Sequence, residues 1–412
     1  MTTEQLDLQF VRGRFPAFSE PSLQGWAHFE NAGGSYACGP AIDRLQRYYV
    51  ANKVQPYAWS DAAIEAGRQM DAARERMAAW LNVATDEVHF GPSTTQNTYV
   101  LGQAFRQHFE LGDEIIVTNL DHEANIGAFR RLADEGFVVR EWQIDPATGE
   151  LDPEGLERLL TDRTRVVAFT HCSNIVGGYN PVTEVVRLAR SAGAITVVDG
   201  VSFCGHGLPD VAALEADIYL FSLYKVYGPH LGVMTMRRAV NERLPAQCHD
   251  FNAGKVAARF TPAGPDHGQI AATNGVIDYF ETVHDHHFGA AVDAATMARR
   301  VCTLFQAHEH ALLQPLLDHL DARPDVRLLG RLDAAARAPT IALDTLRPPV
   351  DVAAALAEHR VGASAGHFYA PRCLEAMGID PQRGVLRLSF VHYTTQAEID
   401  QLVAALDHAL AA

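Results

Sequence analysis

The sequence predicts an α/β protein whose large domain, built on a mostly parallel sheet, is followed by a small C-terminal α+β domain. In the middle of the 412-residue chain, short apolar runs alternate with helical patterns. Such alternation builds parallel sheets through right-handed crossovers. After about Asp278 the pattern changes to long Ala- and Leu-rich helices. There is no internal repeat or Gly/Pro/Ser-rich linker, so we expect one compact assembly.

The strands of the large sheet are predicted by short, mostly apolar runs. Runs of this kind are typical of strands that are buried on both faces. They are Glu114–Val117, Val166–Phe169, Ile195–Val198 and Ile218–Phe221, and Val138–Trp142 is a further strand-like segment.

Helical periodicity fills the intervals between these runs and dominates the C-terminal part. The predicted helices are Thr98–His108, Asn125–Glu135, Leu156–Leu160, Val182–Ser191 ending at Gly193, Tyr279–His310, Pro349–His359 and Gln396–Leu410. Val385–Phe390 is a predicted strand among the last of these helices. We therefore predict three parts: an N-terminal segment 1–30 that contributes to the small domain and the active site, a large domain 31–280, and a small domain 281–412.

Charge and cysteine content exclude several classes of function. The chain has 34 Lys and Arg against 50 Asp and Glu, a net charge of −16, and no basic run, so we expect neither nucleic acid nor a membrane as partner. Its six cysteines form no CxxC pair, which argues against a structural metal site and fits free thiols in a reducing cytosol. Glu4 and Asp7 stand where a signal peptide would be cationic and apolar. We expect a cytoplasmic protein.

Polar side chains follow the predicted strands at the edge where ligands bind in doubly wound sheets. They are Asp121 and His122, His171 to Asn174, Asp199, and Ser222 to Lys225. The glycine fingerprints GxGxxG and GxxxxGK[ST] of dinucleotide and ATP sites are absent. A different cofactor is therefore expected at this edge.

Asp199 ends one predicted strand, and Lys225 comes just after the next one. An amine and a carboxylate so placed fit pyridoxal phosphate, whose aldehyde condenses with a lysine and whose ring nitrogen needs an acid to stay protonated. On spacing alone, a solvated loop lysine and an aspartate that caps a helix are an equally good interpretation.

The segments VVDGVS and FSLYKVYGP resemble the pyridoxal phosphate signature of the class V aminotransferase family, which includes the cysteine desulfurases. Similar motifs run from HFENAGG, which contains Asn31, to LRLSFVHYTT, which contains Arg387. The resemblance implies a fold-type-I transferase that binds pyridoxal 5′-phosphate in its large domain, acts on a small amino acid, and forms a homodimer with sites at the subunit interface.

The resemblance also implies roles around the cofactor ring. Lys225 corresponds to the Schiff-base lysine, Asp199 to the partner of the pyridine nitrogen, and His122 in LDHEANI to the histidine that stacks on the ring and moves protons. Asn174 in HCSNIVGGYNPV corresponds to the asparagine on the phenolic oxygen. Ser202 stands where desulfurases usually carry a glutamine for that oxygen.

The phosphate of the cofactor needs backbone N–H groups at a helix start together with hydroxyls. Thr94 and Thr95 in GPSTTQN resemble the family's phosphate turn, although an STT string alone is more often a plain helix cap. Ser222 and Tyr224 match the serine and histidine of the common SGHK form, with tyrosine replacing histidine.

On the substrate side, Arg387 matches the family's receptor for the α-carboxylate, and Asn31 matches an assisting asparagine. A planar guanidinium binds a carboxylate through two parallel hydrogen bonds. A buried salt bridge is the structural alternative for Arg387.

The chain departs from the desulfurases at their nucleophilic cysteine. Where they read GHHCA, this chain reads GHFYA, so Tyr369 occupies the cysteine position. Tyr369 cannot carry a persulfide, because that step needs a thiolate. The sequence therefore favours chemistry that starts at Cα and ends in transamination, β-elimination at a C–S bond, or epimerisation. The alternatives are a genuine desulfurase that uses Cys373 and a non-catalytic protein that binds the cofactor.

Overall fold

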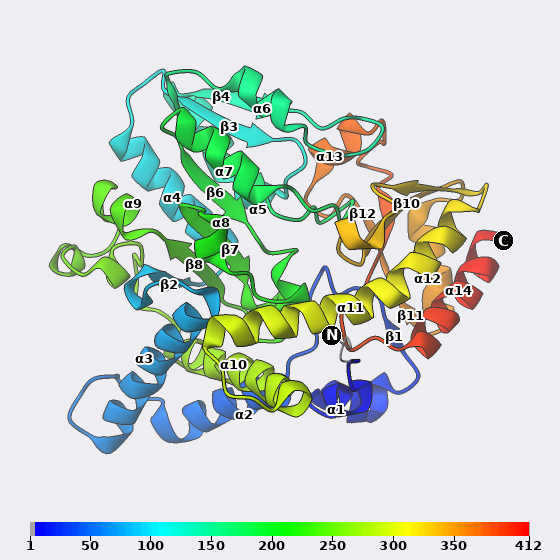
Figure 1. Cartoon of the computed structure of the whole chain (residues 1–412), viewed down its shortest axis with the longest axis horizontal. Helices are drawn as coiled ribbons and strands as arrows, with labels where there is room; N and C mark the ends of the chain where they lie inside the picture. The colour runs from blue at the N-terminus through cyan, green and yellow to red at the C-terminus, as the bar shows by residue number, and fades with distance from the viewer. Residues whose placement is uncertain (1–4, 412) are drawn as a thin grey trace.

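The computed structural model describes residues 5–411, so Glu4 lies outside the described residues. It confirms the predicted α/β class (Figure 1). The large sheet has seven strands in the order β2-β8-β7-β6-β5-β3-β4. Their bounds are β2 Val88–Gly91, β3 Glu114–Thr118, β4 Val138–Trp142, β5 Thr164–Thr170, β6 Ile195–Asp199, β7 Ile218–Ser222 and β8 Gly232–Met236. Strands β3 to β7 pair in parallel, and β8 is antiparallel to both of its neighbours.

Helices cover both faces of this sheet. The helices of the large part are α2 Gly39–Arg47, α3 Asp61–Leu81, α4 Thr94–His108, α5 Glu123–Arg130, α6 Pro153–Leu159, α7 Val182–Ser191, α8 Val211–Leu214, α9 Arg238–Arg243 and α10 His267–Phe288. Successive strand residues pack on opposite sides: Val167 and Phe169 join the core that contains α7, whereas Val166 and Ala168 join the core of α4 and α5. This burial on both faces explains why the strand sequences are continuous apolar runs.

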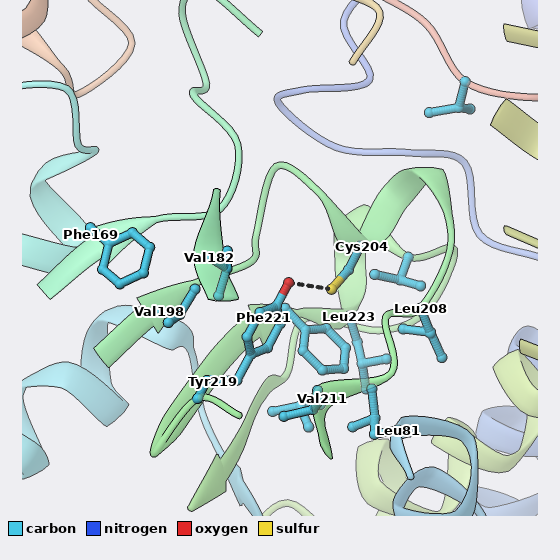
Figure 2. Packing of buried hydrophobic residues seen from close by; sticks show 14 of the residues in the cluster. Leu81, Phe169, Val182, Val198, Cys204, Leu208, Val211, Tyr219, Phe221 and Leu223 are labelled. Atoms are coloured by element: carbon cyan, nitrogen blue, oxygen red, sulfur yellow. Dashed lines mark hydrogen bonds between the residues drawn. The ribbon is translucent and has the colours of Figure 1, made fainter. Parts of the chain in front are cut away.

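Figure 2 shows the core on the α7 side, where Phe169, Val198 and Phe221 from three neighbouring strands lie near Val182 of α7. The Tyr219 hydroxyl lies 3.8 Å from the Cys204 sulfur in the same core. Packing of the buried strands in this core therefore fixes the positions of their carboxyl ends.

A second, four-stranded antiparallel sheet in the order β12-β13-β10-β9 forms the small domain. Its elements are β9 Val326–Leu329, β10 Thr340–Thr345, β12 Ser364–Gly366, β13 Val385–Ser389, α12 Pro349–Glu358, α13 Pro371–Ala376 and α14 Gln396–Ala411. Helix α11, Ala294–Asp321, packs against α3 and α10 at one end and against β9 at the other. In Figure 1 it runs in yellow from the large domain towards the small one.

The N-terminal segment contacts both domains, since Val11 and Phe15 join the core of the large domain and Ala27 and Phe29 join that of the small one. After α1, Leu8–Arg12, strand β1, Ala27–His28, pairs in parallel with β11, Val361–Gly362. The predicted boundary at residue 280 falls inside α10, which packs on α2 and α3, so we propose that the large domain extends to Phe288. Within residues 5–411, no helix combines the length and apolar character needed to cross a membrane.

Several predicted helices differ from the structure. The helix predicted over Asn125–Glu135 is α5, which ends at Arg130 and continues as a 3₁₀ turn, and the one predicted over Leu156–Leu160 begins at Pro153. The predicted single helix Tyr279–His310 is wrong, because Gly289 adopts a left-handed φ of 63° that ends α10, and Asp293 caps a new helix. Helix α4 begins at Thr94 rather than Thr98, because the Ser93 side chain accepts a hydrogen bond from the backbone N–H of Gln96. Strands β2 and β8 escaped prediction, although GVMTM of β8 is itself an apolar run.

Candidate functional site

The structure brings the nine predicted cofactor residues to one cavity at the carboxyl ends of the parallel strands. The predicted residues that line it are Thr94, Thr95, His122, Asn174, Asp199, Ser202, Ser222, Tyr224 and Lys225. A smaller neighbouring cavity is lined by Asn31 and again by Ser202 and Lys225. Residues from four strand ends and from the start of α4 therefore line the same cavity.

Lys225 and Asp199 are two buried titratable residues of this cavity. Lys225 ends a short turn after β7 and is 8% exposed, and Asp199 ends β6 and is 4% exposed. Burial and then Arg387 lower the pKa of the Lys225 amine to about 8, against an opposing contribution from Asp199. Burial raises the pKa of the Asp199 carboxyl to about 6, although the backbone N–H of Val201 donates to Oδ1 at 2.7 Å. A buried amine with a lowered pKa is a good nucleophile, and a buried carboxylate attracts a cationic partner.

His122 caps the start of α5 and is neutral. Its Nδ1 accepts a hydrogen bond of 2.9 Å from the backbone N–H of Ala124, so the ring carries its proton on Nε2. Burial, followed by Lys225 and Arg387, lowers the pKa of His122 to about 3. A neutral imidazole suits stacking on a cationic ring.

Hydroxyl groups gather at the N-terminus of α4. Thr94 Oγ1 lies 2.7 Å from Ser222 Oγ, and both residues are buried. Strand β8 passes directly beneath, where a Cβ on Gly232 would come within 2.4 Å of the Ser93 backbone. Because a helix N-terminus favours negative charge, this corner fits a phosphate.

His230 also lines the cavity and was missed by the sequence reasoning. Its ring stacks on Tyr224 at 4.9 Å with an interplanar angle of 4°. Its place in YGPHLG, five residues after Lys225, was the available signal. His230 therefore supplies an imidazole next to Tyr224, which replaces the histidine of the SGHK form.

Arg387 of β13 lines neither of these two cavities, but it contacts Asn174, which lines the larger one. Its Nη1 donates to the carbonyl oxygen of Asn174 at 3.1 Å, and its Cζ lies 3.8 Å from the centre of the Phe368 ring. The Asn174 amide in turn donates to the carbonyl of Phe368 at 2.9 Å. Three residues therefore form a closed ring of contacts, and Phe368 was another residue that the sequence reasoning missed.

Asn31 is held by other parts of the protein. Its Nδ2 donates to the carbonyl oxygens of His28 and Ser389, at 3.1 and 3.2 Å, and its Oδ1 accepts from the Tyr393 hydroxyl. Both amide hydrogens of Asn31 are thus engaged within the protein.

Tyr369, at the position of the desulfurase cysteine, and Cys373, the alternative nucleophile, lie in different environments. Tyr369 is 67% exposed, and its ring lies 5.2 Å from that of His122. Cys373 is fully buried in α13, and burial raises the pKa of its thiol to about 12. Among residues 5–411, no group of three or more His, Cys, Asp or Glu side chains is placed to hold a metal ion.

Comparisons with known proteins find relatives that match almost the whole chain. The profile of the family described as aminotransferase class-V matches residues 27–402. The whole chain is 31% identical to the whole of an aminotransferase-like protein, FGM3, of Gibberella zeae. It is 30% identical to a probable cysteine desulfurase of Pseudomonas aeruginosa, with 97% of each chain covered. The crystal structure of the Escherichia coli cysteine desulfurase CsdA superimposes with a TM-score of 0.83 at 24% identity, over 98% of both chains, which confirms the predicted fold.

Proposed function

Because the chain belongs to the class V aminotransferase family, we propose that it uses pyridoxal 5′-phosphate to act on a small amino acid at Cα. The observation that carries this proposal is the convergence of Lys225, Asp199 and seven further predicted residues on one cavity. By the same family resemblance, we propose that the chain works as a homodimer.

The residues fit the chemistry of this cofactor. The Lys225 amine would bind the aldehyde, and the Asp199 carboxylate would keep the ring nitrogen protonated. By the family resemblance, His122 would face the ring, and Asn174 and Ser202 would contact the phenolic oxygen. The phosphate would be held by Thr94, Thr95, Ser222 and Tyr224. When bound, the cofactor supplies an electron-accepting ring that stabilises negative charge at Cα.

Arg387 is the proposed receptor for the substrate carboxylate. Its guanidinium is buried and approaches no carboxylate within ion-pair distance among the described residues. A buried cation without an anionic partner favours an anionic ligand. Because the amide of Asn31 is engaged with His28 and Ser389, we propose that Asn31 positions the N-terminal segment instead of binding substrate directly.

The proposed outcome is transamination, C–S β-elimination or epimerisation without a protein-bound persulfide. The burial of Cys373 and its raised thiol pKa oppose the alternative that it acts as a desulfurase nucleophile. The lowered pKa of Lys225 opposes the alternative of a non-catalytic binding protein, because it favours a reactive amine.

Reduction with borohydride tests the cofactor assignment. The purified protein is reduced and digested, and the modified lysine is located by mass spectrometry. The cofactor mass should be found on Lys225 and should be absent in Lys225→Ala, whereas the exposed control Lys255→Ala should keep it. Modification of another lysine would refute the assignment.

A panel of amino acids, incubated with and without a keto acid, then distinguishes the three reactions. Pyruvate, ammonia and sulfide indicate β-elimination, a product that requires the keto acid indicates transamination, and changed chirality of the substrate indicates epimerisation.

A further inference from the structure

The segment Gly366–Ala370, here called the aromatic strap, lies between β12 and α13 and has an unusual backbone. Phe368 and Tyr369 both have left-handed φ angles, of 47° and 57°. Two consecutive bulky residues in this region are rare, because the Cβ atoms crowd the backbone. Such a conformation persists only where the surrounding contacts fix it.

Two hydrogen bonds from the large domain fix the strap, and one of them comes from Asn174 of the cofactor cavity. The carbonyl oxygen of Phe368 accepts a hydrogen bond from the Asn174 side chain at 2.9 Å. The carbonyl oxygen of Tyr369 accepts one from the backbone N–H of Glu123, the first residue of α5, at 2.7 Å. The strap is therefore attached to the loop that follows β5 and to the helix that follows His122.

The Phe368 ring faces the Arg387 guanidinium. The guanidinium carbon lies 3.8 Å from the ring centre, which is the geometry of a cation–π contact. One edge of the guanidinium is fixed by the hydrogen bond from Nη1 to the carbonyl oxygen of Asn174. The guanidinium is therefore held by the Phe368 ring on its flat face and by the Asn174 carbonyl oxygen at Nη1.

Glu30, the carboxylate that influences the charge of Arg387, forms no ion pair with it in the described residues. The Glu30 carboxylate accepts a hydrogen bond from the Ser364 hydroxyl. The remaining N–H groups of Arg387 are therefore available to an anion.

We propose that Phe368 is a positioning residue that holds the guanidinium plane of Arg387 in the orientation that receives the substrate carboxylate through two hydrogen bonds. The inference rests on the proposed function, in which Arg387 binds that carboxylate. Two parallel hydrogen bonds require the guanidinium and the carboxylate to share a plane, so a stacked aromatic ring improves binding without touching the substrate.

Two carbonyl reagents test this on the holoenzyme. Aminooxyacetate and O-methylhydroxylamine both carry an oxyamine nitrogen, which replaces the Lys225 nitrogen on the cofactor carbon and releases the lysine amine. Only aminooxyacetate carries a carboxylate. The ratio of their second-order rate constants, followed by visible absorption, therefore measures carboxylate recognition separately from turnover.

Phe368→Leu should lower this ratio about tenfold, through a slower reaction of aminooxyacetate alone. Phe368→Tyr, which keeps the ring, should retain the wild-type ratio. Phe251→Leu is the matched control, because Phe251 is 80% exposed and lies outside the cavity. An unchanged rate with O-methylhydroxylamine shows that the Phe368→Leu cavity is intact.

Arg387→Ala separates this inference from the proposed function. If Arg387→Ala retains the wild-type ratio, or the wild type shows no preference, the carboxylate role of Arg387 is wrong. If Arg387→Ala loses the preference and Phe368→Leu keeps it, the role of Phe368 is overturned and that of Arg387 stands. If Phe368→Leu slows both reagents equally, the strap controls access and the positioning role is also overturned.

Discussion

The hydroxyl oxygens of Thr94 and Ser222 lie 2.7 Å apart, although 128 positions separate the two residues in the sequence. Thr94 begins α4, and Ser222 ends β7. The contact joins the start of a helix on one side of the cavity to the strand that leads to Lys225. It therefore sets the distance between the proposed phosphate corner and the reactive amine.

Removing either hydroxyl should weaken binding of the cofactor through its phosphate. We expect Thr94→Val and Ser222→Ala each to raise the Kd for pyridoxal 5′-phosphate about tenfold, since a hydrogen bond to a charged group contributes about 1.5–3 kcal/mol. Binding of pyridoxal, which lacks the phosphate, should change little. Thr303→Val on the exposed side of α11 is the control. Equal losses for both ligands would contradict a phosphate role.

The reaction of the apoprotein with pyridoxal phosphate should depend on pH through Lys225. The neutral amine reacts, so the rate should rise with pH and level off above a midpoint near the Lys225 pKa of about 8. Asp199 raises that pKa, so Asp199→Asn should move the midpoint to lower pH. Arg387 lowers it, so Arg387→Ala should move the midpoint to higher pH. Stopped-flow absorbance measures the profile, and midpoints that do not move in these opposite directions would contradict the assignment.

L-Cysteine should give no alanine by way of a protein thiol. Alanine forms when an enzyme thiolate removes the substrate sulfur, whereas β-elimination gives pyruvate, ammonia and sulfide. Cys373 is buried with a thiol pKa raised to about 12, so Cys373→Ser should leave the alanine-to-pyruvate ratio unchanged. Amino-acid analysis together with a pyruvate assay measures the ratio. Stoichiometric alanine that disappears in Cys373→Ser would establish the desulfurase alternative.

Gly232 should be required for the close approach of β8 to the phosphate corner. A Cβ at this position would lie 2.4 Å from the Ser93 carbonyl carbon and 2.7 Å from the Thr94 nitrogen. Gly232→Ala should therefore reduce the free energy of unfolding by about 1–3 kcal/mol and weaken cofactor binding. Gly254→Ala, where a Cβ meets no atom within 4 Å, is the matched control. Thermal melts with and without cofactor compare the two variants.

The strand ends were predictable because they depend on local sequence. Asp199 and Lys225 follow apolar runs that are buried on both sheet faces, so the pattern of the runs locates them without knowledge of the fold. The predicted cofactor residues meet in one cavity because parallel strands end at one edge.

Other parts of the site depend on contacts between distant segments, which the local sequence pattern does not predict. Phe368 stacks on Arg387 across 19 positions of sequence, in a segment whose left-handed backbone no local pattern predicted. Cys373 is close to Tyr369 in sequence, yet helix α13 turns its side chain into the core. Two of the three partners of Asn31, Ser389 of β13 and Tyr393, lie far along the chain, so the HFENAGG motif alone does not reveal these hydrogen bonds.

The strap is held at residue 369 by backbone groups. The Tyr369 N–H donates to His367 Nδ1, its carbonyl accepts from Glu123, and its side chain is 67% exposed. Neither hydrogen bond involves the side chain of Tyr369, so this side chain can be exchanged without loss of the contacts that hold the backbone. A substitution at this exposed position therefore changes the group next to His122 while the two backbone hydrogen bonds of residue 369 stay in place.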